Sequence, residues 1–245
     1  MRMSLIALSA ALCAAATPAA AVDLGNGFSA SVGVSGVSDY RFRGISLSDT
    51  KAAVQGSVTI NHESGVYAGV WGSSLGDSVE PLYGKVESDL FVGYGTEISP
   101  GTSIDLNATF YTYADSPSGT HSDYMEFLGS VKHDFGPAAI KVGGAWAPSM
   151  KATGDQDFIY GYGELSAPIP STPLTFRGHV GVQDLGFASY TDWQLGLETT
   201  LGPVSASLSY VDTSIGRGSD ILAAGFTSSY DNVKAGVVFS LGLAF

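Results

Sequence analysis

The chain of 245 residues has a formal net charge of −12, and 14% of its residues are charged, whereas about 25% is usual in a soluble domain. This negative charge argues against nucleic acid as a partner. After residue 21 there is no apolar run of about eighteen residues, which excludes a transmembrane helix. The 32 Gly, 12 Tyr and 12 Phe favour a barrel with a lipid-facing band and a polar interior, and a water-soluble lipocalin-like barrel is the compositional alternative.

The first residues are typical of a processing signal. Arg2 gives a positive start, residues 4–16 form a short apolar stretch, and residues 19–21 are all alanine. We expect residues 1–21 to be a cleaved secretory signal peptide and residues 22–245 to form one domain. A buried N-terminal helix is the alternative, but no polar face recurs at helical spacing. Cleavage would remove Cys13, the one cysteine, so neither a disulfide nor a thiolate metal site is expected in the mature domain.

Alternating apolar and polar residues, separated by turn signals, predict twelve strands. The strands are expected at 28–43, 52–62, 66–74, 83–95, 102–113, 122–133, 138–147, 156–166, 173–184, 190–201, 203–213 and 232–245. Short Gly or Pro turns follow every second strand, at 63–65, 99–101, 134–137, 168–170 and 202–203, while most other connections are longer and acidic. The longest loop is expected at 214–231, with 221–226 extending its flanking strands. Tight turns at one end and long loops at the other are typical of outer-membrane barrels.

The C-terminal stretch 233–245 alternates throughout and ends on phenylalanine, with Val237, Phe239 and Leu241 on its apolar face. It resembles the terminal strand of bacterial outer-membrane proteins, whose final aromatic residue is read by the barrel-assembly machinery. A long edge strand of a soluble sandwich is the alternative, although such an edge invites aggregation. Because lipid cannot satisfy an unpaired edge, the sheet must close. We therefore predict an all-β fold, a transmembrane antiparallel up-and-down β-barrel of twelve strands closed by a strand ending in Phe245; ten and fourteen strands are the alternatives.

Residue parity along each strand predicts which side chains face the lumen, because a charge in mid-membrane costs about 2–4 kcal/mol on the lipid face. The predicted lumen and constriction residues are Asp39, Arg41, Arg43, Lys85, Glu87, Asp89, Asp105, Glu126, Lys132, Lys141, Arg177, His179, Asp192 and Glu198, with Gln194 and Lys234 on the same parity. Tyr160, Tyr162 and Glu164 are also expected inward, while Tyr67 and Trp71 fit either face. These mixed charges could form an ion-pair network that fills a narrow barrel or a constriction that selects small polar solutes.

Eight aromatic residues fall mainly near predicted strand ends and are expected in girdles at the two membrane interfaces. They are Trp71, Trp146, Trp193, Tyr40, Tyr94, Tyr111, Tyr190 and Tyr210. A track for stacking sugars is the alternative.

The segment Ser-Asp-Tyr-Arg-Phe-Arg-Gly at 38–44 precedes Ser46, Ser48, Ala-Val-Gln-Gly at 53–56 and His-Glu-Ser-Gly-Val-Tyr-Ala-Gly-Val-Trp at 62–71. This block resembles the N-terminal signature of the TorF family of porins, also called the Gcw_chp family. Asp-Tyr-Met-Glu at 123–126 and Tyr-Val-Asp-Thr at 210–213 fit the same resemblance. It spans the mature chain and implies a proteobacterial outer-membrane barrel with a porin function. It implies no particular substrate and no functional residues.

The sequence offers little catalytic machinery. His62, His121, His133 and His179 lack metal-ligand spacing, so neither a metal nor a cofactor is expected. The Gly-x-Ser-x-Gly match at 72–76 precedes an acidic loop, whereas a nucleophile elbow needs a following helix. We therefore expect a protein that is not an enzyme; an outer-membrane hydrolase, using Ser74 or a lumenal Ser–His–acid set around His179, is the weakest hypothesis.

These patterns predict an outer-membrane channel that lets small hydrophilic solutes diffuse passively. A non-conducting structural or adhesin-like barrel with a plugged lumen is the alternative. The expected partners are outer-membrane lipid and lipopolysaccharide, the barrel-assembly machinery through the C-terminal strand, and small polar solutes. The sequence leaves the oligomeric state open.

Overall fold

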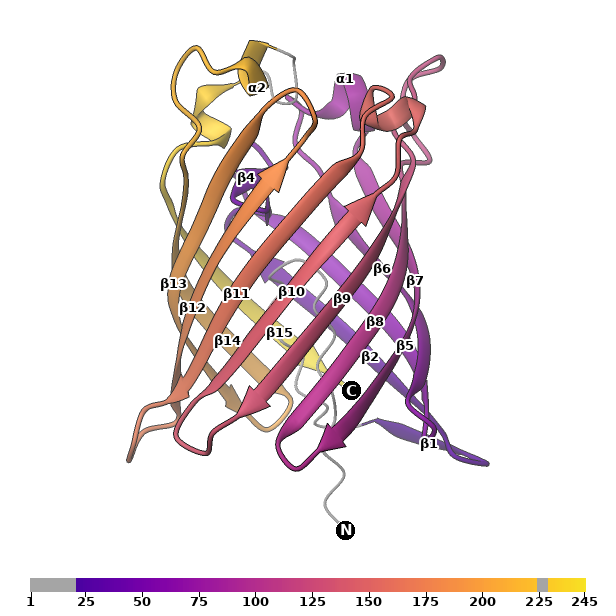
Figure 1. Cartoon of the computed structure of the whole chain (residues 1–245), viewed down its shortest axis with the longest axis vertical. Coiled ribbons are helices and arrows are strands. Elements are labelled where there is room, and N and C mark those ends of the chain that lie inside the picture. The colour runs from indigo at the N-terminus through magenta and orange to yellow at the C-terminus, as the bar shows by residue number, and fades with distance from the viewer. Residues whose placement is uncertain (1–20, 224–228) are drawn as a thin grey trace.

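Strict alternation of apolar and polar residues over long segments produces strands with one face for lipid and one for the interior. The computed structural model describes residues 21–223 and 229–245, in which twelve such strands form a closed antiparallel barrel (Figure 1). The barrel strands are β2 (Phe28–Val37), β5 (Ala53–His62), β6 (Val66–Ser74), β7 (Val86–Ser99), β8 (Thr102–Thr112), β9 (Tyr124–Asp134), β10 (Ala139–Ala147), β11 (Phe158–Pro168), β12 (Leu174–Asp184), β13 (Ser189–Leu201), β14 (Val204–Thr213) and β15 (Gly236–Ala244). The predicted fold and strand count are confirmed.

The ring closes between the first and last barrel strands. β15 pairs with β2 from Ser240↔Val37 to Ala244↔Gly33, and β2 pairs on its other side with β5. Val32 and Phe245 then exchange two backbone hydrogen bonds of 2.8 Å each. The closing contact therefore includes the terminal residue, and the backbone groups of this seam are satisfied within the sheet, as a lipid surrounding requires.

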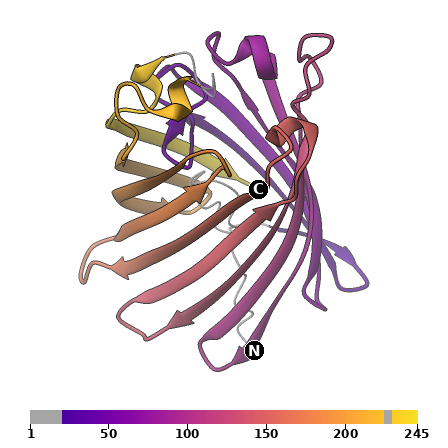
Figure 2. The same ribbon diagram turned by 45° about the horizontal axis from the view of Figure 1, so that its top comes forward.

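The two ends of the barrel differ. One end carries short turns, where Gly101 (φ 77°) and Gly202 (φ 61°) adopt left-handed backbone that other residues rarely tolerate. The other end carries the longer loops and the helical turns α1 (Glu80–Tyr83), η1 (Lys151–Thr153), α2 (Asp220–Ala223) and η2 (Tyr230–Asn232) (Figure 2). We call these the turn end and the loop end. None of the helices in the described ranges is long and apolar enough to cross a membrane.

Outward positions of the strands form an exposed apolar band. Its members include Val54, Leu90, Leu106, Val142, Val180, Leu195, Leu208 and Val237. Many inward positions are polar, as in Ser35, Gln55, Asp105 and Gln194, which take the opposite parity on their strands, while Trp71 and Phe91 belong to a buried inward cluster. An apolar outside and a polar inside indicate a barrel that is solvated by lipid.

The first predicted strand is too long, and this is the main correction to the fold. β2 ends at Val37, and residues 38–52 turn into the barrel as a hairpin of β3 (Arg41–Phe42) and β4 (Ile45–Ser46). Alternation continues through Asp39, Arg41 and Arg43, so parity alone could not show where the strand leaves the wall. A short strand, β1 (Val22–Gly25), also precedes β2 and pairs with it.

Two loops and the N-terminal segment differ from the expected strands or lie outside the described residues. Residues 221–226 were expected to extend strands, but Asp220–Ala223 is the helical turn α2 and residues 224–228 lie outside the described ranges. Lys85 precedes β7 and Lys234 precedes β15, so neither faces the lumen; parity was extended beyond the true strand ends. Most of the expected signal peptide, residues 1–20, also lies outside the described ranges.

Only part of the predicted aromatic girdle lies on the outer surface. Tyr94, Trp146 and Tyr210 are exposed there. Tyr40, Trp71, Tyr111 and Tyr190 are buried inside the barrel, where Tyr40 packs on Trp71 and Tyr111 lies beside Phe42 of the hairpin. Position near a strand end does not distinguish an interface anchor from a side chain that contacts the hairpin.

A pair of neighbouring substitutions tests the two faces. Leu208 lies midway along β14 on the outer surface and is 54% exposed, so Leu208→Arg should lower the free energy of unfolding in vesicles by about 2–4 kcal/mol. Ser207→Arg is the matched control, because Ser207 faces inward opposite Glu198 and should cost much less. Chemical unfolding of both variants gives the comparison, and equal losses would contradict the assigned faces.

Candidate functional site

The hairpin has a tight turn at its tip. Phe42 and Ile45 are directly paired, and the two residues between them, Arg43 (φ 47°) and Gly44 (φ 83°), both have positive φ. Two positive φ values in a two-residue loop define the type I′ class, whose twist suits a β-hairpin. Arg43 therefore projects from the tip of a short rigid element that starts at β2 and reaches toward the opposite wall.

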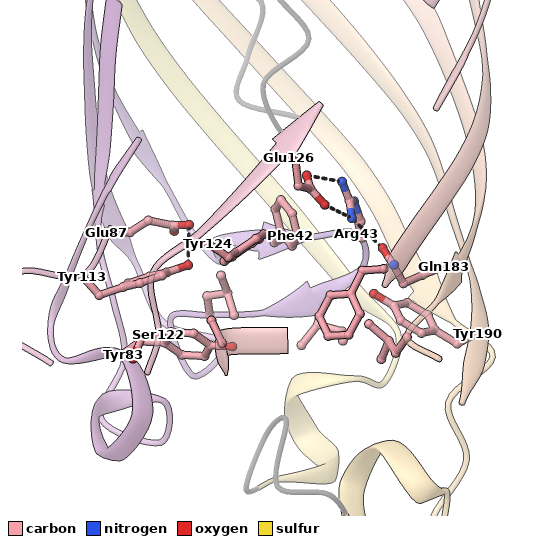
Figure 3. A pocket seen from close by; sticks show the side chains of 15 residues that line it. Phe42, Arg43, Tyr83, Glu87, Tyr113, Ser122, Tyr124, Glu126, Gln183 and Tyr190 are labelled. Carbon is pink, nitrogen blue, oxygen red and sulfur yellow. Dashed lines mark hydrogen bonds and ion pairs between the residues drawn. The ribbon is translucent and has the colours of Figure 1, made fainter. Parts of the chain in front are cut away.

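The guanidinium group of Arg43 is bound by groups on the far wall (Figure 3). Nη1 and Nη2 donate to the two carboxylate oxygens of Glu126 on β9 at 2.9 and 2.7 Å. Nη1 also donates to Gln183 Oε1 on β12 at 2.6 Å. The guanidinium carbon lies 4.2 Å from the ring centroid of Tyr160 on β11, within cation–π range. Glu126 and Gln183 are only 1% and 2% exposed, so this contact is shielded from bulk solvent.

Other hairpin residues contact other parts of the ring. The Tyr40 hydroxyl donates to Glu87 on β7 at 2.8 Å, and the Arg41 Nη1 group donates to the Lys234 carbonyl before β15 at 2.8 Å. Gly44 lies so close to Thr213 and Asp192, on β14 and β13, that a Cβ there would overlap them. The hairpin thus contacts the wall on opposite sides of the barrel near the loop end.

The base of the hairpin is held by its own polar groups. Asp39 accepts hydrogen bonds from Arg41 Nε at 2.7 Å and from the Ser46 hydroxyl at 2.6 Å. The Ser48 hydroxyl accepts a bond from the backbone N–H of Tyr40 at 2.8 Å. These contacts use most of the family-like block at 38–48, which therefore encodes the hairpin structure.

Two loops at the loop end bind the C-terminal side of the hairpin. The backbone N–H of Gly76 donates to the Leu47 carbonyl at 2.8 Å, and that of Ser78 donates to Asp49 Oδ2 at 3.0 Å. The Ser78 hydroxyl also donates to Asp49, and Asn232 bridges the two from the last loop. Burial raises the pKa of Asp49, but these hydrogen bonds more than offset it, so the pKa lies below its ordinary value.

A small cavity of about 50 Å³ lies between the hairpin and the loops (Figure 3). Its lining is aromatic and acidic, and comprises Phe42, Arg43, Ile45, Leu47, Tyr83, Glu87, Tyr113, Ser122, Tyr124, Glu126, Ala152, Phe158, Gln183, Leu185 and Tyr190. Arg43, Glu126 and Gln183 are among the residues that line this cavity, so it adjoins the Arg43 contact.

Acids outnumber bases around the hairpin. Glu87, Asp89, Glu126 and Asp192 are buried wall carboxylates; Arg43 is bonded to Glu126, while Arg41 is bonded to Asp39 of the hairpin itself. Asp89 Oδ1 is buried without a hydrogen-bond partner among the described residues. Within these ranges no three His, Cys, Asp or Glu side chains are arranged as a metal site.

Nearer the turn end, the lumen is lined by paired charges. Lys141 Nζ lies 2.7 Å from Glu164, and Arg177 Nη2 lies 2.5 Å from Glu198. His179 Nε2 lies 3.0 Å from Asp192 Oδ1, and the Tyr67 hydroxyl donates to Asp105 at 2.9 Å. Lys132 is directly opposite Lys141 in the sheet, so two bases share one side of the wall.

The predicted lumen residues therefore separate into three groups. The hairpin carries Asp39, Arg41 and Arg43; the surrounding wall carries Glu87, Asp89, Glu126 and Asp192; and the turn half carries Asp105, Lys132, Lys141, Arg177, His179 and Glu198. Lys85 is wrong as a lumen residue, since its side chain is 61% exposed and lies 3.6 Å from Glu80 in an external loop. Sequence reasoning missed Gln183, whose inward parity on β12 was the available signal.

A closed barrel of twelve strands with an apolar outside and a polar inside is the porin-like fold of outer-membrane β-barrels. The chain belongs to the Gcw_chp family, described as bacterial protein of unknown function, which matches residues 19–245. A comparison with curated proteins gave no match.

Solved structures with the same fold include the KdgM porin, with a TM-score of 0.57, 6% identity, and coverage of 88% of this chain and 98% of KdgM. The NanC porin has a TM-score of 0.55 and 10% identity over 87% of this chain and 98% of NanC. An outer-membrane channel from Pseudomonas putida F1 has a TM-score of 0.51 and 9% identity over 91% and 98%. At such low identity these likenesses establish the fold.

Arginine substitutions test the hairpin contact. Arg43→Ala leaves the buried carboxylate of Glu126 unpaired and should lower the free energy of unfolding by about 3–5 kcal/mol. Arg177→Ala is the matched control, because Arg177 and Glu198 are 37% and 26% exposed and such a pair contributes about 0–1 kcal/mol. Chemical unfolding in one lipid gives both values; similar losses would mean that the hairpin contact contributes no more than an exposed pair.

The Asp49 cluster predicts acid sensitivity at the loop end. Because the folded pKa of Asp49 is depressed, its contribution is present above the unfolded pKa and is lost as pH falls through the folded value. The thermal unfolding midpoint of wild type should therefore exceed that of Asp49→Asn at neutral pH, and the gap should narrow below about pH 4. A gap that stays constant down to acid pH would contradict this assignment.

Proposed function

We propose that this protein is an outer-membrane channel for small polar solutes, with a lumen that the hairpin closes at rest. Its support is the way the hairpin is connected. Within the described ranges β3 pairs with β4 alone, and beyond Ser38, whose backbone N–H donates to Phe239 on β15, residues 39–52 make no backbone hydrogen bond to a barrel strand. The hairpin can therefore leave the lumen while the barrel stays closed.

The barrel size and lining agree with this function. The interior of an eight-stranded barrel is filled by side chains, whereas barrels of sixteen to eighteen strands contain an aqueous channel. A twelve-stranded barrel lies between them, and we infer that its interior has room for one inserted segment such as the hairpin. The turn half is lined by polar groups of both signs that small solutes can contact. One similar structure is the KdgM porin in complex with disordered oligogalacturonate. Here Lys141 and Arg177 are already paired with acids, which favours small solutes over a long polyanion.

Location and assembly follow from the same proposal. The apolar outer band would contact outer-membrane lipid and lipopolysaccharide. The closing strand, with Phe245 bonded to Val32, would present its end to the barrel-assembly machinery. Residues 1–21 would act as the secretory signal.

A non-conducting barrel is the second candidate function, and the buried ion pairs around the hairpin favour it. In that case the hairpin is a permanent part of the core and the external loops carry the activity, as in an adhesin. The two functions differ in whether release of the hairpin produces ion flow.

Planar-bilayer recording of residues 22–245 tests the channel. Wild type should open rarely. Val37 and Ala53 are direct partners, so residues 38–52 can be replaced by Asn-Gly, which forms a two-residue hairpin turn between them. This variant should conduct steadily, and Arg43→Ala should open about tenfold more often than wild type or more, since each 1.4 kcal/mol of lost contact energy shifts the equilibrium tenfold.

Arg177→Ala is the control for a lost lumenal charge that leaves the hairpin in place, and its open time should match that of wild type. If the Asn-Gly variant folds as a barrel but passes no current, the channel proposal fails and the non-conducting barrel remains.

A further inference from the structure

The site that holds Arg43 has the composition of a receptor for a flat cation. A carboxylate binds both terminal nitrogens, an amide oxygen accepts a third hydrogen bond, and an aromatic ring lies under the plane. All three groups belong to the barrel wall, on β9, β12 and β11. Arg43 belongs to the hairpin, so the occupant and the site are parts of different elements.

The wall groups are positioned by contacts that do not involve Arg43. The Tyr111 hydroxyl donates to Glu126 Oε2 at 3.1 Å. The amide nitrogen of Gln183 donates to the carbonyls of Ile159 and Asp184 at 3.2 and 2.9 Å, which directs its Oε1 atom toward the guanidinium group. The site therefore keeps its geometry when the hairpin leaves, and little reorganisation opposes the binding of another cation.

The surrounding charge favours a cation in place of Arg43. Glu87, Asp89 and Asp192 are further buried wall carboxylates, and Asp89 Oδ1 has no hydrogen-bond partner among the described residues. Departure of the hairpin would take Arg43 away from these acids, while Arg41 would leave together with its own partner Asp39. A buried charge left unpaired is costly, so an incoming cation would relieve the cost that hairpin release creates.

The geometry distinguishes among cations. A guanidinium ion is planar, forms two parallel hydrogen bonds to one carboxylate and stacks on an aromatic face, whereas an ammonium ion is a compact, strongly hydrated point charge. Parallel bonds to Glu126 combined with the Tyr160 ring match the first of these shapes.

We infer that Glu126, Gln183 and Tyr160 form a binding site for solutes that carry a guanidinium group, and that Arg43 is its internal occupant. Such a solute enters from the loop end, where the small cavity adjoins the site, and displaces Arg43. Displacement releases the hairpin, so the solute opens its own path. The opening step rests on the proposed channel function, while the binding step stands on the site alone.

Competition with Arg43 determines how tightly a free guanidinium compound is expected to bind the wild-type protein. A tethered group acts at an effective concentration of order millimolar, so a free guanidinium compound binds wild type only after overcoming this internal competitor. Removing the internal occupant should therefore expose the site and increase affinity at least tenfold.

The test is a calorimetric titration of the folded mature protein with methylguanidinium. The methylguanidinium concentration stays far below the range in which it denatures proteins. Arg43→Ala should bind at a half-saturating concentration at least tenfold lower than wild type, and Arg43→Ala with Glu126→Gln should lose this gain. Arg177→Ala, which also frees a lumenal carboxylate, should behave as wild type. Urea tests the planar shape without a charge, and methylammonium tests a positive charge without the planar shape.

The inference is overturned if folded Arg43→Ala binds no methylguanidinium, if Arg177→Ala gains as much, or if methylammonium binds equally well. Should Arg43→Ala fail to fold, the Asn-Gly replacement of residues 38–52 carries the same wall site and takes its place. Methylguanidinium should also raise the open probability of wild-type channels. If methylguanidinium binds but no variant conducts, the channel proposal is wrong and the binding site is supported. If the channels conduct but methylguanidinium does not bind, the binding site is wrong and the channel proposal is supported.

Discussion

A closed ring of twelve strands lies in size between the eight-stranded barrel, which side chains fill, and the sixteen-stranded barrel, which leaves an aqueous channel, and this constraint governs the rest of the structure. The chain fills the space at the loop end with its own hairpin, residues 38–52. The hairpin covers wall residues that face the interior, among them Glu87, Glu126, Gln183 and Asp192, all of which are buried. Toward the turn end, the described residues that face the interior include the ion pairs of Lys141 with Glu164 and of Arg177 with Glu198.

Burial of so many charges is tolerable because nearly every one is bonded. Glu126 accepts from both terminal nitrogens of Arg43 and from Tyr111, and Glu87 accepts from Tyr40 and Tyr113. A well-satisfied polar network fixes one arrangement of its members, whereas loss of one partner exposes the desolvation cost of the others. This network therefore fixes the position of the hairpin, and that position depends on a few contacts.

The barrel could be predicted from the sequence because lipid on one side and water on the other impose a strict period of two. That pattern placed most strand bounds within a few residues and closed the ring at Phe245. The hairpin could not be predicted, since Asp39, Arg41 and Arg43 continue the period of β2 although they belong to another element. Only Gly44 marked a turn, and Arg43 is an unusual residue for positive φ.

The candidate site was predictable as a set of lumenal charges and not as a set of contacts. Parity identified Glu126 and Asp192 as inward, but pairing across the lumen depends on how far the hairpin reaches. Lys85 shows the limit of the method: one residue beyond the end of a strand, parity no longer specifies a direction. Gln183 was missed for another reason: it is uncharged, and inward parity alone does not single out one polar residue among many.

The position of the hairpin in the chain constrains the order of folding. It follows the first barrel strand, yet its docking surface is made by residues 83 and 140 positions away from Arg43, on β9 and β12. That surface does not exist until the later strands are in place. The hairpin can therefore reach its full set of contacts only late in the assembly of the barrel, although it lies near the start of the chain.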